Sequence, residues 1–300
     1  SSDLTDFFSY AKMVLILVCA GLALLVILYR LCVQTLAIKR SYLYIPAGIY
    51  SVLVILSYLF SEYKDFSLLG YNDRFEGTLV LLAYMVMMIF IFNIVNTEKN
   101  IKWILYPLAF SSVILSLIGI SQALDHDFFQ TTLGKMLILP SRAWSAMDTL
   151  SFTFQNREIY QTVYNINYVS FYLTLLIPLF GMLFIHSFMK ESEEPIRKKL
   201  LWGIIFALLV FNLIGSASSG GLLGMAVAVL AAFILLNKKI LQWIKPVAIL
   251  LVIAALVFGA TANRWIPEFT SAVKGVTGGD TAAAPVESPS QDTTVEPGSA

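Results

Sequence analysis

The sequence predicts an all-α fold, a polytopic transmembrane helix bundle of about eight spans. Hydrophobic residues make up 58% of its 300 positions and charged residues only 13%, whereas a soluble domain carries about 25% charged residues. The mean hydropathy is +0.78. The charges are confined to short stretches between long apolar runs, which is typical of an integral membrane protein and leaves the loops to carry any water-facing chemistry.

Eight apolar runs predict the spans, because a hydrocarbon core of about 30 Å requires roughly 17–25 helical residues. The runs are residues 13–29, 42–60, 78–95, 103–124, 166–189, 200–215, 222–236 and 246–262. The sixth and seventh are short and flank residues 216–221, which predict a tight hairpin or a locally broken helix. The predicted helical domain therefore covers residues 1–262 and includes an external loop at 125–165.

Residues 263–300 predict a disordered external tail, since they are rich in small residues, Pro and acids and cannot bury apolar surface. Their composition is typical of the start of a larger loop, and we expect a truncated C-terminal part to follow.

Lys and Arg predict the orientation, because cytoplasmic loops are enriched in both. Twelve of the 20 cations fall in short alternate connections, and eight are spread over longer ones. The first set is Arg30, Lys39, Arg40, Lys99, Lys102, Lys190, Arg197, Lys198, Lys199, Lys238, Lys239 and Lys245. The second is Lys12, Lys64, Arg74, Lys135, Arg142, Arg157, Arg264 and Lys274. We expect the first set to be cytoplasmic, with both termini and the loops at 61–77 and 125–165 outside the plasma membrane.

The predicted spans contain no Asp, Glu, Lys or Arg, which argues against an ion-driven pump. Asn93 and Asn212 are single amides within apolar runs and predict hydrogen bonds between helices. Small residues at helical spacing predict close helix packing. One such stripe is Gly220, Gly224, Ala228 and Ala232, and another is Ser112, Ser116 and Gly119.

The two external loops combine Arg, carboxylates and aromatic rings. Sugar rings stack on aromatic side chains, a planar guanidinium binds phosphate, and a carboxylate can deprotonate a hydroxyl. The alternative is an interfacial aromatic belt, which many membrane proteins have. Residues 125–127, Asp-His-Asp, are of ligand type but lack a partner motif, so the sequence predicts no metal site.

Three segments resemble the O-antigen ligase and O-antigen polymerase family. Gly70-Tyr-Asn-Asp-Arg-Phe-Glu-Gly77 is similar to the Gly-x-x-x-Arg-Phe-Glu-Gly segment of that family. Thr162-Val-Tyr-Asn-Ile-Asn-Tyr168, leading into a Pro-containing helix, resembles its Asn-Pro-Asn-Tyr stretch. Residues 216–221 lie where many members have a Ser-Arg-Gly turn. The order and spacing of all three agree, over roughly residues 45–240.

The resemblance implies a multi-span glycosyltransferase of the C type, acting outside the plasma membrane without metal, cofactor or nucleotide sugar. The donor would be a glycan on undecaprenyl diphosphate, and the acceptor a saccharide or lipid-anchored saccharide. External Arg residues would hold the diphosphate, and the anomeric centre would be inverted. No nucleic acid is implied as a partner.

Two departures from the family pattern bear on activity. Ser219 replaces the Arg of the Ser-Arg-Gly turn, and Ile166 replaces the Pro of Asn-Pro-Asn-Tyr. The family also uses a His in a large external loop late in the chain. That loop would begin near residue 275, so its His is absent here and the catalytic residue is unknown.

The residues that we expect to bind substrate lie near the outer membrane surface. They are Arg74, Arg157, Tyr164, Asn165, Asn167 and Tyr168. The two Arg residues would stabilise the negative charge of a leaving diphosphate. The two Asn amides would reach sugar hydroxyls if this stretch is extended, and the two Tyr rings would share one face of a helix.

Two other functions remain open at this point. A transporter with the same helix packing would need a polar path, and these spans offer only scattered Ser, Thr and Asn. A non-catalytic scaffold for cell-envelope assembly would need no catalytic His.

Overall fold

The computed structural model of the chain is all-helical in the residues that it describes. These residues are 9–33, 38–71, 75–95, 97–139, 144, 158–163, 165–189, 194–240, 243–262, 266 and 270. The helices are α1 (Ser9–Cys32), α2 (Tyr44–Phe60), α3 (Lys64–Leu69), α4 (Thr78–Ile94), α5 (Glu98–Ala123), η2 (Phe128–Gln130), α6 (Thr132–Ile138), α7 (Ile166–His186), α8 (Ile196–Gly215), α9 (Ser219–Ile240) and α10 (Ile244–Ala260). All eight predicted apolar runs coincide with helices.

Four helices are long and apolar enough to cross a membrane. They are Ser9–Cys32, Lys99–Ala123, Ile166–His186 and Ile196–Gly215. Four shorter apolar helices accompany them: Tyr44–Phe60, Thr78–Ile94, Ser219–Ala232 and Ile244–Ala260. The described fold is therefore all-helical, with four helices that could span a membrane by their length and composition.

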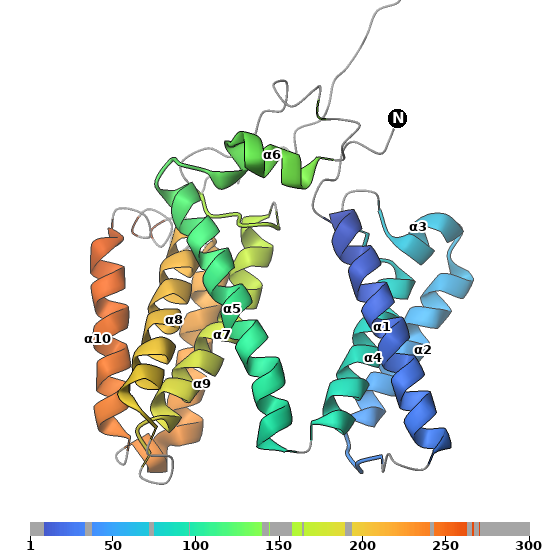
Figure 1. Cartoon of the computed structure of the whole chain (residues 1–300), viewed down its shortest axis with the longest axis horizontal. Coiled ribbons are helices and arrows are strands. Elements are labelled where there is room, and N and C mark those ends of the chain that lie inside the picture. The colour runs from blue at the N-terminus through green and yellow to red at the C-terminus, as the bar shows by residue number, and fades with distance from the viewer. Residues whose placement is uncertain are drawn as a thin grey trace, which may run out of the picture.

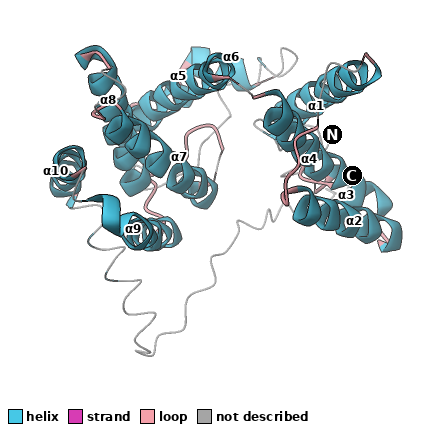
Figure 2. Ribbon diagram, turned by 90° about the horizontal axis from the view of Figure 1, so that it is seen from below, coloured by secondary structure: helices cyan, strands magenta, loops and turns pink. Residues whose placement is uncertain are grey.

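The helices pack in two groups (Figures 1 and 2). In the N-terminal group, α1, α2 and α3 all contact α4. In the C-terminal group, α8 contacts α5, α7, α9 and α10, and η2 and α6 extend from the end of α5. The chain passes from one group to the other between α4 and α5, at the lower end of the view in Figure 1.

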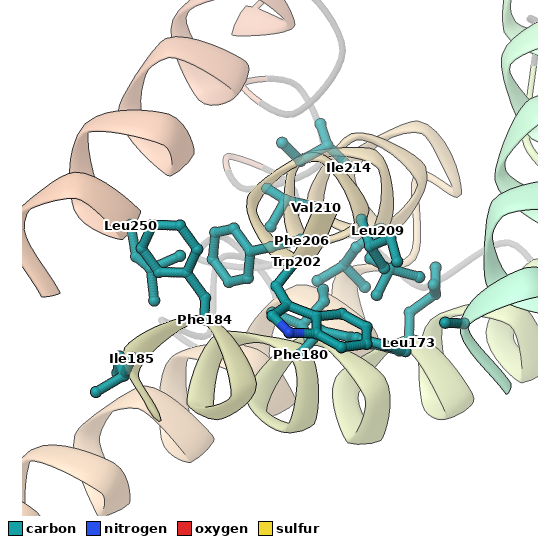
Figure 3. Close-up of a cluster of buried hydrophobic side chains, with 14 of the residues drawn as sticks. Leu173, Phe180, Phe184, Ile185, Trp202, Phe206, Leu209, Val210, Ile214 and Leu250 are labelled. Carbon is teal, nitrogen blue, oxygen red and sulfur yellow. The ribbon is translucent and has the colours of Figure 1, made fainter. Parts of the chain in front are cut away.

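Aromatic rings fill the core of the C-terminal group, between α7, α8 and α10 (Figure 3). Phe180 of α7 is fully buried, and its ring centroid lies 5.9 Å from that of Trp202 on α8. Tyr106 of α5 stacks on the same indole at 6.4 Å. Because a large aromatic side chain buries more apolar area than any other, these rings fix how α5, α7 and α8 pack.

Two lysines satisfy carbonyls at the C-terminal ends of helices, where four carbonyls lack a partner within the helix. The Nζ of Lys64 donates to the carbonyls of Tyr58 and Leu59 at 2.9 and 2.6 Å. The Nζ of Lys39 donates to those of Phe92 and Val95 at 2.7 and 2.6 Å. Both lysines therefore stabilise the N-terminal group internally.

Asn93 forms the predicted hydrogen bonds between segments of the N-terminal group. Its Oδ1 accepts from the backbone N–H of Lys39 at 3.0 Å, and its Nδ2 donates to the hydroxyl of Tyr44 at 2.8 Å. The side chain is 2% exposed. The amide thus joins α4 to the start of α2.

The turn at residues 216–218 ends α8 and begins α9, which confirms the predicted break. The expected small-residue stripe on α9 is wrong, because Gly220, Gly224 and Ala232 are exposed and an added Cβ at Gly220 would meet no atom within 4 Å. The close approach occurs one residue later, where a Cβ at Gly221 would overlap the side chain of Ser170 on α7. The register of α9 therefore places Gly221 at the α7 interface.

We predict that Gly221→Ala lowers the free energy of unfolding by about 1–3 kcal/mol, because the added methyl group overpacks the α7–α9 contact. Gly220→Ala is the matched control and should cause no loss, since its Cβ enters open space. The measurement is unfolding in mixed detergent micelles, followed by circular dichroism. Equal destabilisation by both variants would contradict the assigned register.

Candidate functional site

The segment 158–163 lies inside the protein, although the sequence predicts it as part of an external loop. Ile159, Tyr160 and Gln161 are 0%, 2% and 0% exposed. The backbone here is irregular, so its polar groups have no helical partners and need others when buried. The N–H of Ile159 donates to the carbonyl of Gly215, at the end of α8, at 2.9 Å.

The side chain of Gln122, on the last turn of α5, supplies most of the other partners. Its Oε1 accepts from the backbone N–H groups of Tyr160 and Gln161 at 3.1 and 2.8 Å. Its Nε2 donates to the carbonyl of Gln161 at 3.1 Å. One amide side chain therefore pairs with this backbone as a neighbouring strand would.

The side chain of Gln161 continues the network into the helices. Its Nε2 donates to Oδ1 of Asn212 at 2.8 Å, and its Oε1 accepts from the hydroxyl of Tyr172. Asn212 in turn donates to the carbonyl of Ser116 at 3.3 Å. A Cβ at Gly119 would overlap Asn212, so this position needs glycine. Asn212 is the predicted interhelical amide, and it joins α8 to α5.

Asp127 anchors the other end of the segment. It accepts from the hydroxyl of Tyr160 and, at 3.0 Å, from the N–H of Phe129. Its neighbour His126 lies against the carbonyl of Leu124 through Nδ1 at 2.7 Å. In the part of the chain that the structure describes, no group of three or more His, Cys, Asp or Glu side chains is placed to hold a metal ion.

The predicted Asn residues lie where α7 begins, and both have partners within the chain. Asn165 is the N-cap: its Oδ1 accepts from the N–H groups of Asn167 and Tyr168 at 2.9 and 3.3 Å. Asn167 accepts through Oδ1 from Ser218 at 2.9 Å, and Ser170 donates to the same serine at 3.0 Å. Of these two residues only Asn165 has an extended backbone, because Asn167 already belongs to α7.

These contacts join two of the segments noted in the sequence, residues 162–168 and 216–221. Capping of this kind contributes about 1 kcal/mol per helix, and the Ser218 hydroxyl also accepts from the N–H of Gly221 at 3.3 Å. The start of α7 and the α8–α9 turn are therefore one hydrogen-bonded unit.

The third segment, residues 70–77, is closed by its two glycines. Gly70 has φ of +92°, and a Cβ on either Gly70 or Gly77 would overlap the backbone of the other end of the loop. Thr78 fixes the closure by donating from Oγ1 to the carbonyl of Ser67 at 2.9 Å. The two glycines of this segment therefore lie against each other, and residues 72–74 between them lie outside the described residues.

The first turns of α1 contact both loops. The ring of Tyr10 packs edge-to-face on Phe75 at 5.4 Å. Two residues later, the Nζ of Lys12 donates to the carbonyl of Thr162 at 2.5 Å and lies 3.4 Å from its hydroxyl. Residues 70–77 and 158–163 therefore lie at the same end of the molecule, on either side of α1.

Backbone strain gathers at this end. Among the described residues other than glycine, the positive φ angles are at Phe75, Asp125, Gln161 and Ala217, between +48° and +60°. They lie between α3 and α4, between α5 and η2, in the segment before α7, and between α8 and α9, respectively. Such conformations persist only where surrounding contacts impose them, and they cluster at functional sites.

Arg74, Arg157 and Tyr164 lie outside the described residues. The structure brings Asn165, Asn167 and the half-buried Tyr168 together at the start of α7. Gln122, Gln161 and Lys12 were missed in the sequence, because each is a single polar residue without a motif. A signal existed for Gln122, since it is the last polar residue before a long loop that must be anchored.

Comparison with family models, with curated proteins and with solved structures finds no match for this chain. The site is therefore interpreted from its own residues and from the resemblance of its three segments.

We predict that Gln122→Leu frees the segment 158–163. Each buried N–H that loses its acceptor costs about 1–3 kcal/mol, and Gln122 accepts from two. Amide hydrogen exchange at residues 158–163 should accelerate, as measured by mass spectrometry. Gln130→Leu is the control, because Gln130 is exposed at the end of η2. Unchanged protection in the Gln122 variant would contradict this anchoring.

Proposed function

We propose that the chain is a membrane glycosyltransferase that moves a glycan from undecaprenyl diphosphate to a saccharide acceptor, as in the O-antigen ligase and polymerase family. One observation carries this proposal: the three segments that resemble the family gather at one end of the fold. Residues 162–168 and 216–221 are hydrogen-bonded through Ser218. Residues 70–77 and 158–163 both contact the start of α1.

In this proposal the eight apolar helices all span the plasma membrane. The shorter ones include α2 and α4, of 17 residues each. Such a helix is roughly 25 Å long, and a small mismatch is accommodated by local thinning of the bilayer. Eight spans put both termini on one side.

The cations support an outer location for the strained end. Arg30, Arg40 and Lys102 lie near helix ends at the opposite side of the fold, together with most members of the denser set. The positive-inside rule then makes that side cytoplasmic. The loops at 61–77 and 125–165 face outward, at the depth of lipid headgroups.

The proposed chemistry is substitution at the anomeric carbon of the donor. The acceptor hydroxyl forms a bond to that carbon, the bond from the carbon to the diphosphate oxygen breaks, and undecaprenyl diphosphate leaves with its electron pair. Inversion follows from a single displacement. Arg74 and Arg157 would bind the leaving diphosphate, since fixed guanidinium groups favour the charge that develops there.

The described residues of the site would position the substrate-binding loop rather than transfer a proton. Asn165 and Asn167 are engaged in capping and in the contact to Ser218, so they would hold the loop that carries Arg157 and Tyr164. Their role in binding sugar hydroxyls, and the stacking of sugars on Tyr164 and Tyr168, stay part of the proposal. The group that removes the acceptor proton is unassigned.

We predict that Arg74→Lys and Arg157→Lys each reduce glycan transfer by about 10²-fold or more, because a lysine keeps the charge but loses the bidentate geometry. Transfer from a radiolabelled undecaprenyl-diphosphate glycan is measured with the full-length protein in proteoliposomes, alongside donor binding. Arg197→Lys, an exposed position at the opposite end, is the control and should retain transfer.

Full transfer by both variants would remove the diphosphate clamp. A donor that neither binds nor reacts with the unaltered protein would leave a transporter or an assembly scaffold as the function, which uptake of solutes into the same liposomes would distinguish.

A further inference from the structure

Lys12 joins the two helix groups at the end of the molecule opposite their covalent connection. It lies on α1, in the N-terminal group, and donates to Thr162, in the segment held by the C-terminal group. At the other end, α4 leads into α5, where the Nδ2 of Asn100 donates to the carbonyl of Ile94 at 2.9 Å. The groups are thus linked at both ends, covalently at one and by a side chain at the other.

Thr162 is a rigid point of attachment. It follows Gln161, whose backbone N–H and carbonyl both pair with Gln122 of α5. Thr162 is therefore held to α5 by hydrogen bonds of the preceding residue and, through Gln161 and Asn212, to α8. Lys12 holds the C-terminal group as a body and not merely a loose loop.

The surfaces of α1 and α5 are largely apolar. Large apolar side chains on α1 and α5 remain well exposed, among them Leu15 at 64%, Leu22 at 59% and Leu117 at 55%. In a bilayer such faces meet lipid or each other with little difference in free energy, because lipid tails are as apolar as leucine. A polar contact at the rim then has a large share in setting the separation.

We infer that the hydrogen bond from Lys12 to Thr162 fixes the separation of the two helix groups, and that the groups hinge at the connection between α4 and α5. We call this contact the catch. An ammonium group on a flexible stem suits this role, since it donates to a carbonyl and a hydroxyl without a fixed geometry. Both acceptors on Thr162, a carbonyl and a hydroxyl, are neutral.

The catch also sets how far apart the two loops of the site lie. Tyr10, two residues before Lys12, contacts Phe75 in the loop at 70–77, and Lys12 itself contacts the segment at 158–163. Closing the catch brings these loops to the same rim of α1. That this regulates transfer rests on the proposed function, whereas the catch itself does not.

The test is the distance between spin labels on the two groups, measured by pulsed electron resonance in lipid nanodiscs. Labels are placed by Leu79→Cys on α4 and Leu133→Cys on α6, both exposed, after Cys19 and Cys32 are replaced by Ser. Lys12→Met should lengthen and broaden the distance distribution. Lys12→Arg keeps the donors and should restore the distribution of the unaltered protein.

Lys64→Met is the matched control. Lys64 also donates to two carbonyls, but both belong to α2 in its own group, so its loss should leave the distance unchanged. An unchanged distribution in Lys12→Met would overturn the catch, as would equal broadening in both Met variants. A lengthened distance in Lys12→Met, with neither donor binding nor glycan transfer by the full-length protein, would sustain the catch and refute the proposed function.

Discussion

The upper end of this molecule depends on the three hydrogen bonds that the side chain of Gln122 makes to residues 160 and 161. Irregular backbone that is buried is stable only where protein or water satisfies its polar groups. Without Gln122, two buried N–H groups and a carbonyl would lack partners. The network continues through Gln161 to Asn212, so that the ends of α5, α7 and α8 are fixed relative to one another.

This anchoring explains how ordinary helices position an unusual set of loops. The three segments that resemble the glycosyltransferase family are not catalytic groups in themselves. Gly70 and Gly77 close a loop, Asn165 begins a helix, and Ser218 joins that helix to a turn. Each of these contacts fixes the backbone next to a residue that is proposed to bind substrate. Pre-organised donors stabilise a developing charge better than mobile ones do, so such a scaffold suits the proposed transfer.

The sequence predicted the helices well, because apolar runs of this length have few alternatives. The break at 216–218 and the interhelical amides Asn93 and Asn212 were also correct, since polar groups within apolar runs need partners. The buried segment at 158–163 was missed, because the backbone N–H groups of Ile159, Tyr160 and Gln161 find their acceptors 38 or more positions away in the chain. The exact register of α9 was missed because neighbouring glycines, Gly220 and Gly221, look alike in a sequence.

The candidate site was predicted only in part. Asn165, Asn167 and Tyr168 lie at the start of α7, and their role in binding substrate stays a prediction. The sequence let both amides reach sugar hydroxyls only if the entry to the helix were extended, whereas α7 already includes Asn167; Asn165 is the cap and Asn167 accepts from Ser218. The pattern of apolar residues shows that a residue lies at a helix end, but not which hydrogen bond it makes there. Arg74, Arg157 and Tyr164 lie outside the described residues, and their roles stay predictions.

The most direct test of the account is the side of the membrane on which the strained end lies. Single cysteines at Tyr71 and Leu137, both exposed, and at Ile196 on the opposite side are introduced after Cys19 and Cys32 are replaced by Ser. Intact cells are then treated with a membrane-impermeant maleimide. The account predicts that positions 71 and 137 react at once and that 196 reacts only after the cells are opened. The reverse pattern would contradict it, because a transferase of this kind meets its lipid-linked donor outside.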